Sequence, residues 1–303
     1  MTTLKTMQRL GMALGVLLMP LAAQAAPSTY AQAETRAAVG ADGASDQDVQ
    51  GPLIGSTSAD SSASWPRVGA GSSASSSMQA SAAYGALRAH GTVRASGPNA
   101  RGTIGSEFAG DPLTAALFED QILIGGAGTQ TFQLHYALTG SAGSVGPGQM
   151  QFAADLTLQA WGTGITITDG PAPVGFSFFP PYIDTYGLSV SGSSPRAFGD
   201  SAYLVISASA GSVLNLSGAL GAYMSLSNPI DGGESQATLD LSHTAAYFIV
   251  PVTPGTTFTA ASGHDYLAAP VPEASTAALM LAALPFVGWA HARRRLLRAR
   301  QRL

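Results

Sequence analysis

The strongest constraint on the fold is a two-residue period of large apolar side chains in the middle of the chain. Every second residue of 132–138 is Phe, Leu or Tyr, and residues 152–158 repeat the spacing with Phe, Ala and Leu. Successive side chains of a strand point to opposite faces, so this period places the large residues on one face of a sheet. Helical periodicity is nearly absent before the C-terminal tail, and its one rival, residues 112–120, could form a turn or two of helix.

Further short apolar runs follow, each bounded by Gly, Ser, Asn or Pro. They occupy residues 203–206, 214–216, 220–226, 238–241 and 247–250. Short strands with such punctuation are typical of a β-sandwich. We therefore expect an all-β fold, a jelly-roll-like antiparallel β-sandwich over residues 63–268. The chain has no cysteine, so the stability of this domain must come from its core.

The stretch before this domain is rich in small residues. Residues 26–62 are mostly Ala, Ser, Gly and Asp, which offer little apolar surface to offset the entropy of ordering. This composition predicts a disordered linker. Residues 65–81 are again rich in Ser and Ala, and residues 83–94 form the first candidate strand pair.

The N-terminus has the pattern of a secretory signal peptide. Lys5 and Arg9 precede a short apolar run, residues 10–21, and Ala23 and Ala25 form a small-x-small cleavage site. The apolar run is too short for a stable membrane span. We expect removal of residues 1–25 after Ala25 and export of the remainder.

The C-terminus combines an apolar span with a basic end. Seventeen residues without a charge lie between Glu273 and His291, and as a helix they cover about 25 Å, near the lower limit for a bilayer core. We expect a transmembrane helix over residues 274–291 and a cytoplasmic end over residues 292–303. This end carries Arg293, Arg294, Arg295, Arg298, Arg300 and Arg302. Such a cluster faces the cytoplasm, so the preceding body lies across the membrane.

A short motif directly before the span carries a family resemblance. It consists of Val271, Pro272, Glu273, Ala274, Ser275 and Thr276. With the span and the arginines, residues 271–303 closely resemble the PEP-CTERM sorting signal of Gram-negative bacteria, although Ala274 stands where the family has a second proline. The resemblance implies an integral-membrane exosortase as a transient partner, cleavage near Pro272, and a place among exopolysaccharide or biofilm matrix at the cell surface or outside the cell. The alternative is an ordinary membrane anchor that is never cut.

Charge and composition narrow the possible partners. Residues 26–272 hold six Lys and Arg against seventeen Asp and Glu, a formal net charge of −11. Phosphate binding requires clustered cations, so a nucleic-acid partner is not expected. The secretion translocon and signal peptidase are the partners that export implies. Without cysteine there is no thiolate catalysis and no cysteine-ligated metal, and we expect no cofactor.

The chain offers no compact catalytic motif. Gly-x-Ser-x-Gly, the phosphate-binding loop and His-Glu-x-x-His are all absent, and the four histidines of the body are scattered. His135 falls on the polar face of its predicted strand. The acids of 119–120 and 231–234 could hold calcium, but Asp-Gly in the latter favours a tight turn. Two carboxyls of a glycosidase need only meet in space. We expect no enzyme.

The best candidate for recognition is an aromatic stretch interrupted by two prolines. The candidate contacts for a glycan or a protein partner are Trp161, Phe178, Phe179, Tyr182, Asp184 and Tyr186. Flat rings stack on the C–H faces of sugars and a carboxylate accepts hydrogen bonds from hydroxyls. The alternative is that Phe176, Phe178 and Phe179 cover one end of the core.

Two functions follow from these patterns. The first is an exported, non-enzymatic surface or matrix protein that is sorted through its tail. The second is an exported polysaccharide-active hydrolase or a carbohydrate-binding module on a β-sandwich. Two facing acids in a groove lined by Trp161 or Tyr182 would favour the hydrolase.

Overall fold

The described part of the chain consists of strands, turns and loops. The structure, a computed structural model, describes residues 26–67, 71–105, 107–108, 111–112, 114–173, 175–176, 184–228 and 233–267. The strands are β1 (Ser28–Val39), β2 (Asp42–Leu53), β3 (Thr57–Arg67), β4 (Ser72–Ala83), β5 (Ala86–Ser96), β6 (Ala100–Ile104), β7 (Glu107–Phe108), β8 (Asp111–Pro112), β9 (Thr114–Gly125), β10 (Thr129–Val145), β11 (Gln149–Trp161), β12 (Ile165–Asp169), β13 (Gly175–Phe176), β14 (Asp184–Gly192), β15 (Arg196–Ser209), β16 (Val213–Asn228), β17 (Glu234–Pro251) and β18 (Thr257–Ala260).

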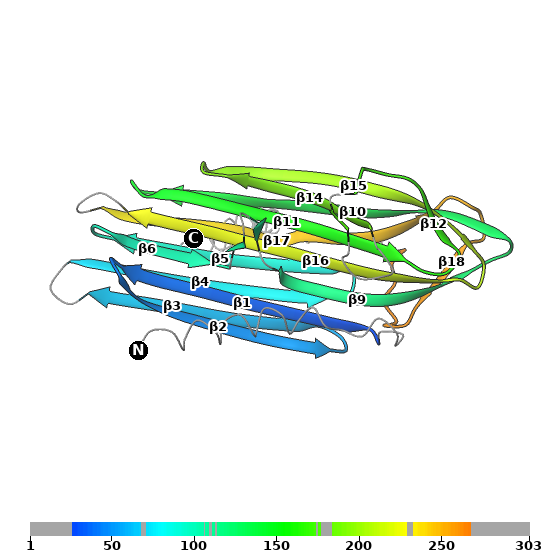
Figure 1. Ribbon diagram of the computed structural model, residues 1–303, viewed down its shortest axis with the longest axis horizontal. Helices are drawn as coiled ribbons and strands as arrows, with labels where there is room; N and C mark the ends of the chain where they lie inside the picture. Colours follow the sequence, from blue (N-terminus) through cyan, green and yellow to red (C-terminus); the bar gives the residue numbers. More distant parts are fainter. Residues whose placement is uncertain are drawn as a thin grey trace, which may run out of the picture.

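The long strands form two antiparallel sheets. Sheet A has the order β13-β14-β11-β16-β6-β1-β9-β18, with β2 paired to β1, and sheet B has the order β12-β15-β10-β17-β5-β4-β3. Strands β6 and β9 share one position in sheet A, because each pairs with both β1 and β16. The short β7–β8 hairpin separates them. The strands of both sheets run along the long axis of the molecule (Figure 1).

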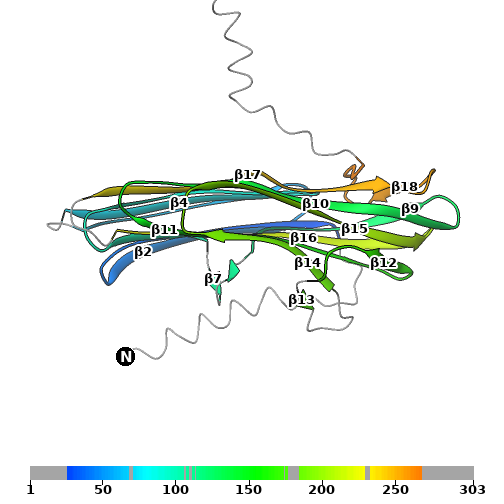
Figure 2. The same cartoon turned by 90° about the horizontal axis from the view of Figure 1, so that it is seen from above.

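The two sheets face each other as in a β-sandwich. Figure 2 shows them edge on, with β17, β4 and β10 in one layer and β11, β16 and β14 in the other, and with β7 projecting from the second layer. One core of buried apolar residues lies between them. The predicted alternation is confirmed, because the large residues of 132–138 and 152–158 all point into this core.

The prediction of a disordered linker over residues 26–62 is wrong. These residues form β1, β2 and most of β3, and the two-sheet body therefore begins well before residue 63. Alternate alanines of β1 are fully buried. Hydroxyl pairs also join the sheets, with Thr29 Oγ1 2.6 Å from Thr57 Oγ1 and Thr35 Oγ1 2.8 Å from Ser61 Oγ. This stretch folds with little apolar area because its small side chains let the two sheets approach closely and because its buried hydroxyls pair with one another.

Side chains close the sandwich edge formed by β2 and β3. Asp46 Oδ2 accepts a hydrogen bond from the backbone N–H of Ser62 at 3.0 Å, and Asp48 Oδ2 accepts one from that of Asp60 at 3.1 Å. These N–H groups lie on the unpaired edge of β3. Unpaired edges invite pairing with another chain, and carboxylates that occupy them prevent it. The acidic residues of this segment therefore have a structural use.

Aromatic rings fill the core where the long strands cross. Phe118 and Tyr247, both fully buried, meet edge to face with ring centroids 5.0 Å apart. The Tyr247 hydroxyl donates to the Thr157 backbone carbonyl at 2.9 Å, which links sheet B to sheet A. Burial raises the pKa of Tyr247 well above its ordinary value. Gly218 leaves room for both rings, since a Cβ at that position would lie 2.5 Å from Phe118.

A buried carboxylate fixes the last described segment to the body. Asp120, 3% exposed, accepts hydrogen bonds from the Ser262 backbone N–H at 3.2 Å, from the Ser262 hydroxyl and from the Tyr266 hydroxyl at 3.0 Å. Its neighbour Gln121 contributes a fourth bond through its backbone N–H. The Tyr266 carbonyl in turn accepts from Ile249 N at 2.7 Å. Burial, followed by the Asp120 charge, raises the pKa of Tyr266.

The two sorting segments predicted from the sequence lie outside the described residues. These are the signal peptide, residues 1–25, and the tail, residues 271–303. Among the residues that are described, no helix has the length and apolarity needed to cross a membrane.

Candidate functional site

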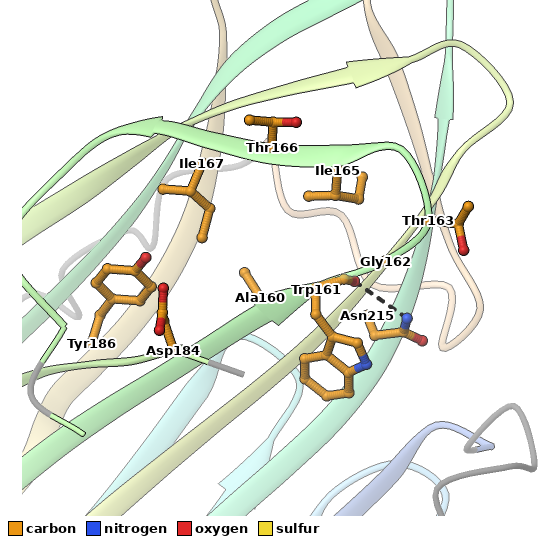
Figure 3. A pocket seen from close by; sticks show the side chains of 10 residues that line it. All are labelled: Ala160, Trp161, Gly162, Thr163, Ile165, Thr166, Ile167, Asp184, Tyr186 and Asn215. Atoms are coloured by element: carbon orange, nitrogen blue, oxygen red, sulfur yellow. Dashed lines mark hydrogen bonds between the residues drawn. The ribbon is translucent and has the colours of Figure 1, made fainter. Parts of the chain in front are cut away.

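A hollow of about 660 Å³ opens at the end of the sandwich where β11, β12 and β14 meet. Figure 3 shows Ile165 and Ile167 on one side of it, Asp184 and Tyr186 together on another, and Trp161 with Asn215 below. The described residues that line the hollow are Ala160, Trp161, Gly162, Thr163, Ile165, Thr166, Ile167, Asp184, Tyr186 and Asn215.

Trp161 ends β11 and is held in place through its backbone. Its carbonyl accepts a hydrogen bond from Asn215 Nδ2 at 3.3 Å, and it pairs in register with Asn215 of β16. The indole falls on the outward face of sheet A, since Leu158 and Ala160 of the same strand point into the core. Its side chain is half-buried. One part of the indole is thus available to a ligand.

Asp184 and Tyr186 lie two residues apart at the start of β14 and therefore on the same face of that strand. Asp184 is exposed, and Tyr186, which pairs with Leu158 and points inward, is 4% exposed. Burial raises the pKa of the Tyr186 hydroxyl, and the nearby Asp184 carboxylate adds to the rise. The phenol therefore stays protonated and neutral, while the carboxylate beside it faces solvent.

These groups have the chemistry of sugar recognition. An indole offers an apolar face for C–H groups, whereas an exposed carboxylate and a side-chain amide hydrogen-bond hydroxyls. Binding sites commonly combine apolar walls with a few such polar groups. Ile165 and Ile167, partly buried against the core, supply an apolar wall on the side of β11 from which Ala160 points (Figure 3). The hollow can bind a small polar molecule with a flat apolar face.

The structure brings together three of the six residues that the sequence nominated. Trp161, Asp184 and Tyr186 line one hollow, whereas Phe178, Phe179 and Tyr182 lie outside the described residues. The alternative of a core cap concerns Phe176, Phe178 and Phe179, whose side chains lie outside the described part of the chain; Tyr186 itself is buried in the core.

Sequence reasoning missed the other half of the lining. Asn215 lies in an apolar run of the sequence and has no signal of its own there, and only the register of β11 with β16 places it beside Trp161. Ile165 and Ile167 did carry a signal, because Ile and Thr alternate over residues 165–168. That short run is β12, which pairs with β15.

The other described histidines and acids are not among the residues that line the hollow. His135 lies on the outer face of sheet B as predicted, where its Nε2 is 3.0 Å from Gln133 Oε1. Glu119 and Asp120 lie within β9, not in a turn. His264 stands against the Tyr266 ring, and burial lowers its pKa. The described residues contain no group of three or more His, Asp or Glu side chains able to hold a metal ion.

Comparison with known proteins gives no family for the chain. No protein-family model matches it, and no curated protein matches it either.

Proposed function

We propose that this is an exported, non-enzymatic surface or matrix protein whose β-sandwich binds a glycan at the Trp161 hollow. The observation that carries the proposal is a hollow at one end of the sandwich whose lining includes Trp161, Asp184, Tyr186 and Asn215. In this proposal the signal peptide directs export of the chain. The tail, residues 271–303, then directs its sorting by an exosortase. The body then remains among exopolysaccharide at the cell surface or outside the cell.

The strand order supports the finer description of the fold. From β9 to β18, and leaving out the two-residue β13, successive strands alternate between the two sheets along the chain. This alternation is the connectivity of a jelly roll, whose two sheets are built from interleaved strands. We include a jelly-roll-like sandwich in the proposal. Sandwiches of this kind present loops and sheet faces to ligands without needing a catalytic centre.

The acids around the hollow favour binding over hydrolysis. Glycoside hydrolysis uses a pair of carboxyls about 5 to 10 Å apart. Among the described lining residues, Asp184 is the one carboxylate. We therefore place the polysaccharide-active hydrolase second. Release of reducing ends from a polysaccharide by the purified exported protein would reverse this order.

Replacing Trp161 tests the binding proposal. We expect Trp161→Ala to weaken retention of the exported protein on its glycan about five-fold, because stacking on an aromatic ring contributes roughly 1 kcal/mol. Affinity electrophoresis in gels containing soluble polysaccharide measures this retention. The matched control is Tyr203→Ala, which removes an exposed aromatic ring from the outer face of sheet B. Equal loss in both variants would show that the hollow is not the binding site.

A doubly tagged precursor tests the sorting proposal. We expect a tag after Leu303 to separate from the body in cells with an exosortase, while a tag placed before Pro272 travels with the body. Immunoblots of fractionated cells follow the two tags. Changing Glu273 should leave the precursor in the membrane. Recovery of both tags on one full-length membrane species, with and without the exosortase, would favour the uncut anchor instead.

A further inference from the structure

Three rings stand in line across the outer face of sheet B. Tyr203 of β15 and Phe248 of β17 are both in register with His135, which lies between them on β10. The His135 ring stacks on that of Phe248 with centroids 4.8 Å apart, and the Tyr203 ring lies 5.2 Å away on the other side. Burial lowers the pKa of His135, so its imidazole is uncharged at neutral pH. The line of rings is therefore an aromatic surface without charge.

Two valines flank the rings on the same three strands. Val205 and Val250 are both in register with Gln133, which precedes His135 by two residues on β10. Tyr203 is 42% exposed and Val250 is 38% exposed. Every second residue of 131–137, 201–207 and 246–250 faces outward here, and none of these is Asp, Glu, Lys or Arg. We define the aromatic patch as Tyr203, His135, Phe248, Val205 and Val250. Exposed apolar patches of this kind mark interaction sites.

The last described residues lie directly beside this patch. Ile249, between Phe248 and Val250 on β17, donates its backbone N–H to the Tyr266 carbonyl at 2.7 Å. The bond from Tyr266 to Asp120 fixes this segment, and with it the point where the chain leaves the body. Seven residues lead from Leu267 to Ala274, where the predicted membrane span begins, and they reach at most about 25 Å. The three strands of the patch are only about 10 Å across. A precursor held by the span therefore keeps the whole patch close to the bilayer.

Two outer faces flank this point, and they differ in chemistry. On the sheet A side, Ala261 N–H donates to the Gln121 carbonyl at 2.7 Å, which places β9 next to the last segment. The outer face of β9 presents the Glu119 carboxylate and the Gln121 amide, since the residues between and beside them are buried. Taking such groups out of water costs free energy. The sheet B side presents the aromatic patch, and aromatic rings with a polar atom settle readily at a membrane–water boundary. Of the two faces, that of sheet B suits lipid.

We propose that the aromatic patch rests on the lipid surface of the membrane while the tail still anchors the precursor. This inference rests on the proposed export and membrane span, and adds the face of the body that meets the bilayer. The patch is small, so its contact depends on the span, which keeps the local concentration of patch and lipid high. Cleavage of the tail removes that help, and the body then leaves the membrane.

Single cysteines can report this contact, because the chain has none of its own. The full chain without its signal peptide is reconstituted in phosphatidylcholine vesicles, whose neutral headgroups do not repel the exposed Asp265. A membrane-impermeant fluorophore is attached at Ala137→Cys, two residues from His135, or at Gln151→Cys, which is exposed on the outer face of sheet A. We expect lipids with a nitroxide on the headgroup to quench the label at position 137 at least about two-fold more strongly than the label at 151, because aromatic surfaces lie at headgroup level.

A double variant assigns the contact to the patch. Tyr203→Ser with Val250→Ser should reduce quenching at position 137 to the level at 151, and the urea midpoint should hardly move because both side chains are partly exposed. The matched control is Val49→Ser with Leu53→Ser, which removes two equally exposed apolar side chains from β2. This control should leave the quenching unchanged.

The outcomes separate this inference from the proposal on which it rests. Equal quenching at 137 and 151, in a chain that floats with the vesicles, would overturn the lipid contact and leave the membrane anchor in place. A chain that does not float with the vesicles would overturn the anchor itself. Contact at position 137 that requires an exosortase in the same vesicles would assign the patch to a protein partner and would also overturn the lipid contact.

Discussion

Asp120→Ala is expected to lower the free energy of unfolding by roughly 3 to 4 kcal/mol. The substitution removes the acceptor of four hydrogen bonds and leaves the hydroxyl of Tyr266, whose ring is 2% exposed, without a partner. A buried donor left unsatisfied costs about 1 to 3 kcal/mol, and bonds to a charged acceptor are stronger than neutral ones. Urea unfolding followed by tyrosine and tryptophan fluorescence measures the change. Hydrogen exchange should also quicken at residues 261–267.

The control for this substitution is a carboxylate that makes the same local hydrogen bond but is exposed to solvent. Asp200 also accepts a hydrogen bond from the backbone N–H that follows it, Ser201 N at 2.8 Å, but it is exposed. We expect Asp200→Ala to change stability by less than about 0.5 kcal/mol, as surface substitutions usually do. If Asp120→Ala cost no more than Asp200→Ala, the last segment would be held by its apolar contacts alone.

Phe118→Ala should destabilise the body by about 4 kcal/mol, through a cavity at the centre of the sandwich. Phe118 is fully buried, and its ring meets Tyr247 at 5.0 Å and Tyr266 at 6.5 Å between centroids. Its loss removes apolar contacts from both sheets, and the surrounding strands are too well paired to collapse into the space. The midpoint and slope of urea unfolding measure the effect.

A second position on the same strand serves as control. Leu123 of β9 is 47% exposed, so we expect Leu123→Ala to cost less than about 1 kcal/mol. Gly218→Val tests the same region from the opposite direction, because its side chain would collide with Phe118 and Tyr247. Near-native stability of Phe118→Ala would mean that the two sheets pack differently from the arrangement described.

The C-terminal two thirds of the fold could be predicted because large apolar side chains occur there at every second residue, as in strands. Residues 132–138 show it plainly, and β10 follows the prediction. The sequence shows two apolar runs within residues 214–226, whereas the structure has one strand there, β16. Gly218 lies between the two runs, and its lack of a side chain leaves room for Phe118. The N-terminal third could not be predicted, since its alternating residues are mostly Ala and Ser, which differ little in hydrophobicity and size. Whether such a stretch folds depends on a second sheet that accepts small residues, which composition alone does not reveal.

The candidate site was half predictable for a similar reason. Trp161, Asp184 and Tyr186 stood out as residues able to recognise a ligand. Asn215 did not, because amides in strands are common and only the register of the strands shows what lies beside them. The pairing of β11 with β16 places Asn215 beside Trp161 across a sequence separation of 54 residues.

The hydrogen bonds that Asp120 makes also limit the distance between the folded sandwich and the sorting motif. Tyr266 is the last side chain that they anchor, and the sorting motif begins at Val271. Five residues span at most about 18 Å when fully extended. Under the proposed processing near Pro272, six residues beyond Tyr266, the exosortase must cut within about 22 Å of a folded sandwich, or it must cut before residues 261–267 have docked. Folding and cleavage would then compete for the same short tether, and the timing of one would decide the outcome of the other.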